Sequence, residues 1–117
     1  MKTQTARTQE RALLIQVICG HQAREEAADS LAELERLTDT AGAVVLGSIT
    51  QRRDRPDSAF FIGQGKLAEI QLAGRETKAN LLIFDNELAP VQVNNLDLAV
   101  GLKVIDRTEL ILSLIHI

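Results

Sequence analysis

The stretch FFIGQGKLAEI, residues 60–70, holds residue types that bind phosphate groups in many proteins. Two glycines, a lysine and an expected helix start are typical of phosphate-binding loops, in which N–H groups at a helix start point toward an anion. Gly63, Gly65 and Ala68 also satisfy the G-x-G-x-x-G/A fingerprint of dinucleotide-binding proteins. Asp85 follows about 20 residues later, where that fingerprint places the acid that binds a ribose. The spacing therefore raises nucleotide binding as a hypothesis.

Several features of the same stretch oppose this hypothesis. A Walker-type loop needs a glycine where the chain has Phe60 and a hydroxyl where it has Leu67. The run AFFI before the glycines is short for the first strand of a dinucleotide fold, and the chain is short for a whole one. The residues favour a tight turn in which Gly63 and Gly65 adopt unusual backbone angles and Lys66 opens a helix. A small nucleotide- or dinucleotide-binding enzyme domain that uses this GxGxxA loop remains the alternative.

A cluster of arginines precedes the glycines. Arg52, Arg53 and Arg55 lie in the polar segment QRRDRPDS, residues 51–58, which we expect to be a loop. Guanidinium groups form bidentate hydrogen bonds with phosphate, so the cluster suits contact with nucleic acid. Charge clusters are also common on solvated loops. At this point both interpretations stay open.

Other residues with chemical potential predict less. Asp85, Glu87 and Asp106 fall at the ends of expected strands, where open α/β sheets bind ligands, but helix caps and turn acids are commoner at such positions. We interpret Asp85 and Asp106 as helix starts. His21 and His116 lie far apart in the sequence with no other ligand type clustered near either. We therefore predict neither a metal site nor a catalytic residue.

Four apolar runs predict buried strands, and the amphipathic segments between them predict helices. Glycines at 42 and 101 are expected helix stops, and Asp106 with Glu109 has the capping-box spacing of a helix start. Because strands and helices alternate, the fold class is α/β, a small three-layer domain with a mostly parallel four-stranded sheet flanked by helices. Strands are expected at 12–19, 43–50, 80–85 and 103–107, and helices at 20–42, 66–78, 86–101 and after 106.

Composition limits the classes of function. The net charge of −3 gives no global basic field that would attract nucleic acid or a membrane. Aromatic residues make up 3%, without Trp or Tyr, which argues against a stacking platform for single-stranded nucleic acid. The N-terminus lacks the apolar stretch of a secretory signal, and no run approaches the roughly 18 apolar residues of a membrane span. We expect a cytoplasmic protein.

Three segments together resemble the N-terminal domain of HflX-type GTPases. They are RRDRPDSAFFIGQGKLAEI, then LLIFDNELAPVQVNNLDLAVGLKVIDRTELIL, and the strand–helix–strand before them. The resemblance covers roughly residues 11–112. The matching positions are Arg53, Pro56, Phe61, Ile62, Gly63, Gly65, Lys66, Glu69, Ile70, Phe84, Asp85, Glu87, Leu88, Pro90, Gln92, Asn95, Leu96 and 104–108.

The resemblance implies a domain that is followed, in full-length members, by a helical hairpin and a GTPase domain that holds GTP and Mg²⁺. It implies association with the large ribosomal subunit, in ribosome splitting, rescue or biogenesis, with ribosomal RNA, the hairpin and the GTPase domain as partners of a monomer. This segment then has no cofactor and no catalysis of its own. Arg52, Arg53, Arg55 and Lys66 become candidate RNA contacts. Nucleotide binding attributed to the N-terminal part of some members keeps the glycine loop, residues 63–65, as a candidate nucleotide site.

The sequence also departs from the family pattern. Gln64 stands where a lysine is common, Glu109 replaces a common glycine, and SLIHI does not continue the pattern. We therefore divide the chain into a polar leader (1–10), the α/β domain (11–112) and a truncated, non-native tail (113–117), and expect a fragment of a longer protein. A purely structural domain that docks on its own GTPase module, without affinity for RNA, is a further hypothesis.

Overall fold

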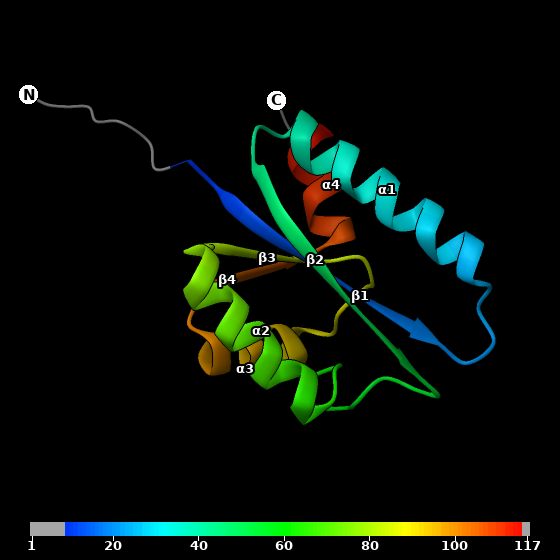
Figure 1. The fold of residues 1–117 in the computed structure, drawn as a ribbon. Helices are drawn as coiled ribbons and strands as arrows, with labels where there is room; N and C mark the ends of the chain where they lie inside the picture. The colour runs from blue at the N-terminus through cyan, green and yellow to red at the C-terminus, as the bar shows by residue number, and fades with distance from the viewer. Residues whose placement is uncertain (1–8, 116–117) are drawn as a thin grey trace, which may run out of the picture.

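A computed structural model describes residues 9–115, which form one four-stranded sheet and four helices (Figure 1). All strand pairings are parallel, in the order β2-β1-β3-β4 across the sheet. The predicted α/β class is confirmed. Within residues 9–115, no helix combines the length and apolar character that crossing a membrane requires. The elements are β1 (Arg11–Cys19), α1 (Arg24–Thr40), β2 (Val44–Arg53), α2 (Gln64–Thr77), β3 (Leu81–Phe84), α3 (Pro90–Val100), β4 (Lys103–Asp106) and α4 (Arg107–Ile115).

The helices cover both faces of the sheet, with α1 and α4 on one face and α2 and α3 on the other (Figure 1). Side chains alternate along β1, because successive residues of a strand point to opposite faces. Leu13 and Ile15 join the core cluster that includes Ile70 of α2 and Leu96 of α3. Leu14 joins the second cluster, with residues of α1 and α4. Two covered faces explain why the central strands β1 and β3 are almost continuously apolar.

The helix ends agree with most of the predicted signals. Gly42 and Gly101 adopt positive φ angles of 91° and 76° just past α1 and α3, as expected for helix stops. The Asp106 carboxylate accepts a hydrogen bond from the Glu109 N–H at 3.0 Å, so the predicted capping interaction at the start of α4 is confirmed.

Two predicted boundaries were wrong. The helix expected from 86 begins at Pro90, because proline fits the first helical position, where an N–H would have no intrahelical partner. Asp85 therefore does not start a helix. The other wrong boundary lies at the end of β2, which continues through Arg53 into the segment expected to be a loop.

The extra length of β2 comes from its pairing with β1. β1 pairs with β3 only from Ala12 to Ile15, but continues along β2 as far as Cys19, opposite Arg53. The last residues of the two strands, 16–19 and 50–53, extend beyond the paired part of β3 and are called the ribbon end below (Figure 1). The divisions proposed for the termini fall partly outside the described residues, since the leader includes residues 1–8 and the tail includes 116–117.

Candidate nucleic-acid interface

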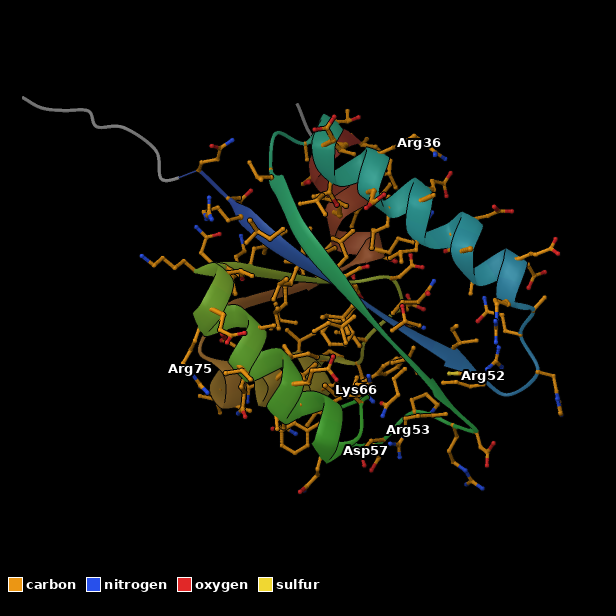
Figure 2. All side chains as sticks on the ribbon, in the orientation of Figure 1. Arg36, Arg52, Arg53, Asp57, Lys66 and Arg75 are labelled. Atoms are coloured by element: carbon orange, nitrogen blue, oxygen red, sulfur yellow. The ribbon has the colours of Figure 1, made fainter. Side chains whose placement is uncertain are left out.

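The arginines expected on one loop lie on different elements and faces. Arg52 and Arg53 are the last residues of β2, opposite Ile18 and Cys19 in the register with β1. Neighbouring strand residues point to opposite faces of a sheet, so Arg52 lies on the α1 face and Arg53 on the α2 face. Arg55 follows in the exposed turn after the strand. The cluster is compact in sequence but divided by the sheet (Figure 2).

The Arg52 guanidinium holds the turn between β1 and α1. It donates hydrogen bonds to the carbonyl oxygens of Gly20 at 2.8 Å and Gln22 at 3.1 Å. Gly20 has a φ of 57°, and its N–H donates to the Arg53 carbonyl at 2.9 Å. Both strands of the ribbon end and the turn that leaves it are therefore tied together.

Arg53 lies against the turn that precedes α2. Its Nε donates to the Arg55 carbonyl at 3.3 Å, and its guanidinium occupies the space that a Cβ on Gly63 would need. Lys66 lies in the first turn of α2, which begins directly after Gly63. Its ammonium pairs with Glu69 at 3.0 Å in an exposed ion pair, an arrangement that contributes little to stability.

A polar side chain that the sequence analysis passed over, Asp57, organises the turn between Arg53 and α2. Its carboxylate accepts hydrogen bonds from the N–H groups of Ala59 at 2.9 Å and Phe60 at 2.7 Å. Those bonds, followed by the nearby Arg53 charge, hold the pKa of Asp57 below its usual value, although partial burial acts in the opposite direction. Asp57 and Phe61 also exchange two backbone hydrogen bonds, so the expected extended piece AFFI is instead a closed turn.

Two amides of α3 fix this turn to the body of the domain. Gln92 donates to the Asp57 carbonyl at 3.0 Å, and Asn95 donates to the Ala59 carbonyl at 3.0 Å. Phe61 is buried with a φ of 68°, and its ring meets Phe84 edge to face at 6.3 Å between centroids. The core and the two amides together hold a backbone conformation that phenylalanine rarely adopts.

The glycines do not play the part predicted from the sequence. Gly63 has φ −76° and ψ 161°, an ordinary extended conformation, and Gly65 lies within α2 with no atom within 4 Å of an added Cβ. The unusual backbone angle belongs to Phe61. Gly63 is needed for close approach, since its N–H donates to the Gln51 side chain at 3.0 Å and Arg53 packs against it.

Asp85 belongs to a separate network on the α1 face. Its carboxylate, 3% exposed, accepts hydrogen bonds from Gln16 at 2.9 Å and from Arg107 at 2.6 Å. Arg107 also pairs with Glu33 of α1, and Gln16 donates to the Ala27 carbonyl at 2.6 Å. The network supplies hydrogen-bond donors to both oxygens of the buried Asp85 carboxylate.

The position of Asp85 opposes the dinucleotide interpretation. The fingerprint needs the acid and the glycine loop on one ligand, yet Asp85 faces α1 whereas Gly63 packs beside Arg53 on the α2 face. The crevice between β1 and β3, where open sheets of this kind bind ligands, is occupied by Asn86, whose side chain bonds the N–H and the carbonyl of Val17 at 2.9 and 2.8 Å.

The bonding partners of the three arginines distinguish this edge. The ion pairs found within residues 9–115 involve Lys66 and Arg107 but none of Arg52, Arg53 and Arg55. Their side-chain hydrogen bonds go to backbone carbonyls, which carry no net charge and leave donors unused, and the Asp57 carboxylate acts on Arg53 only from beyond ion-pair distance. Within the same described range, no group of three His, Cys, Asp or Glu residues could hold a metal ion, and His116 lies outside it.

The fold and this edge define a small α/β domain with a parallel sheet. Comparison with known proteins identifies the family to which this domain belongs. Residues 28–115 match the family described as GTP-binding GTPase N-terminal. The GTPase HflX of Caldanaerobacter subterraneus is 40% identical over 109 residues, covering 93% of this chain and 24% of the relative. The GTPase HflX of Escherichia coli is 41% identical over 86 residues, covering 74% and 20%. The chain belongs to this family of N-terminal domains, whose relatives here are HflX GTPases.

A solved structure shares the fold. A GTP-binding protein from the hyperthermophilic archaeon Sulfolobus solfataricus, in complex with GDP, superimposes with a TM-score of 0.58 at 23% identity. The match covers 89% of this chain and 29% of that protein. This chain spans about a quarter of the length of the curated relatives that it matches.

Proposed function

We propose that this domain is the ribosome-contacting N-terminal arm of an HflX-like GTPase in the cytoplasm. Its relatives carry the name GTPase HflX and are about four times as long. GTP, with Mg²⁺, is then bound and hydrolysed by the remainder of the protein, and this domain contributes affinity for the RNA of the large ribosomal subunit. The activity of the whole protein serves ribosome splitting, rescue or biogenesis.

One observation carries the RNA part of the proposal. Arg52, Arg53 and Arg55 are clustered at the ribbon end and its turn, and no ion pair within residues 9–115 neutralises them. Arginine binds phosphate through two parallel N–H groups, and phosphate contacts provide most of the affinity for nucleic acid that does not depend on sequence. Lys66, in the first turn of α2, adds a fourth cation whose exposed pair with Glu69 is easily exchanged for a phosphate.

The test is co-sedimentation of the 117-residue chain with purified large ribosomal subunits across a salt series. Removing one phosphate contact should lower the slope of log affinity against log salt by about one unit. Replacing Arg36 or Arg75, exposed arginines on α1 and α2 (Figure 2), with glutamine removes the same charge elsewhere and should leave the slope unchanged. If the folded chain fails to pellet at low salt, ribosome binding does not reside in this domain.

A further inference from the structure

Resting on the proposed function, we propose that the ligand of the ribbon end is the phosphate backbone of double-helical RNA. Arg53 and Arg55 are the contacts, and Arg52 is a positioning residue that holds the contacting surface in place. Three features of the domain support this assignment: the burial of its aromatic rings, the rigidity of the cationic edge, and the different surroundings of the three arginines.

Single-stranded RNA is bound mainly by stacking unpaired bases on aromatic side chains. This chain has no Trp or Tyr and three phenylalanines. Phe61 and Phe84 are 6% and 0% exposed and pack on each other, and Phe60 is partly buried against the same core cluster. Two of the three rings are therefore closed to a base and the third is only partly exposed, which favours the backbone as the part of RNA that this surface holds.

The cationic edge is held rigidly. Asp57 closes the turn after Arg55 through hydrogen bonds to two N–H groups, and Gln92 and Asn95 tie that turn to α3. The Gly63 N–H bonds to the β2 side chain of Gln51, which fixes the start of α2 beside Arg53. A preorganised array of cations suits the fixed phosphate spacing of a double helix, because neither partner then loses much conformational freedom on binding.

The three arginines are not equivalent. Arg52 directs two N–H groups at the carbonyls of Gly20 and Gln22, which commits its guanidinium to the turn. Arg53 uses its Nε on the Arg55 carbonyl, and no side-chain hydrogen bond of Arg55 is found within residues 9–115. The terminal nitrogens of Arg53, one of which packs beside Gly63, and the whole guanidinium of Arg55 are thus the groups whose donors have no acceptor among the described residues.

The inference is tested by fluorescence anisotropy with the 117-residue chain and two labelled probes of equal phosphate number, an RNA hairpin of about 16 base pairs and an unstructured single strand. We expect the hairpin to bind on the order of tenfold more tightly at the same salt, because its phosphates are denser and fixed. Arg53→Gln should lower the salt slope by about 0.9 for the hairpin. Arg52→Gln removes the same charge together with the two hydrogen bonds to the turn, and it should weaken binding less and leave the slope near its original value.

The possible outcomes separate this inference from the proposed function. Equal or tighter binding of the single strand overturns the duplex preference but leaves ribosome binding intact. Binding to large subunits without binding to either probe also overturns it, since the contact then depends on another ribosomal component. If the chain binds neither the large subunits nor the two probes, the proposed function is overturned. An Arg52→Gln slope reduced as much as that of Arg53→Gln makes Arg52 a phosphate contact and refutes its positioning role.

Discussion

Replacing Gly65 with alanine gives a direct test of what the glycine loop is for. Gly65 is helical, and an alanine Cβ would meet no atom within 4 Å. The substitution therefore costs nothing in the folded state and reduces the conformational freedom of the unfolded chain. The gain is about 0.5–1 kcal/mol in a helix interior, and we take about 0.5 for the first turn of α2. This corresponds to a rise of about 2–3 °C in the melting temperature.

The assay is urea unfolding followed by circular dichroism. The denaturation midpoint should rise with an unchanged slope. Gly101→Ala is the matched control, since the added Cβ also meets no atom within 4 Å, but the φ of 76° penalises an L-residue. It should lower the free energy of unfolding by about 1 kcal/mol. If Gly65→Ala destabilises the domain as much as Gly101→Ala does, then Gly65 is required for a close approach and the account of this loop is wrong.

Two other side chains give predictions of different kinds. Arg107→Met leaves the Asp85 carboxylate, 3% exposed, without its charged partner and should lower the free energy of unfolding by about 3 kcal/mol. Glu33→Ala, which removes the exposed partner of Arg107, should cost less than about 1 kcal/mol, and similar losses would contradict the assignment. The pKa of Asp57 is lowered by folding, so its stabilisation is present above its unfolded pKa of about 3.9 and is lost as pH falls through the folded value. Asp57→Asn should flatten the decline in urea midpoint below about pH 4, and parallel curves would contradict that role.

The sequence predicted the elements better than it predicted their ends. Continuous apolar runs identified the strands because both faces of the sheet are covered by helices. Only residues 51–53 of the ribbon end were expected to be a loop, because this part of the edge strand β2 carries polar side chains near solvent and its pairing with β1 left no apolar pattern. The left-handed Phe61 had no local signal, since only the core and the closed turn around it stabilise that conformation.

The candidate site was predicted only in part. The arginines form one cluster in the sequence, but the periodicity that places Arg52 and Arg53 on opposite faces can be applied only when β2 is known to continue through Arg53. Asp57 was overlooked although Pro-Asp-Ser is a turn signal, and it could have been found from that chemistry. The link between Asp85 and Arg107 joins β3 to α4 and requires the tertiary fold.

The proposed function requires that arginines without an ion-pair partner, at the ribbon end and in the turn after it, bind ribosomal RNA. The most direct measurement compares two double variants in co-sedimentation with large subunits across a salt series, Arg53→Gln with Arg55→Gln, and Arg36→Gln with Arg75→Gln. Both remove two positive charges from the folded chain. The account predicts that the first pair lowers the salt slope by about two units and the second leaves it unchanged. Equal effects of the two pairs would show that net charge alone governs binding and would contradict the claim.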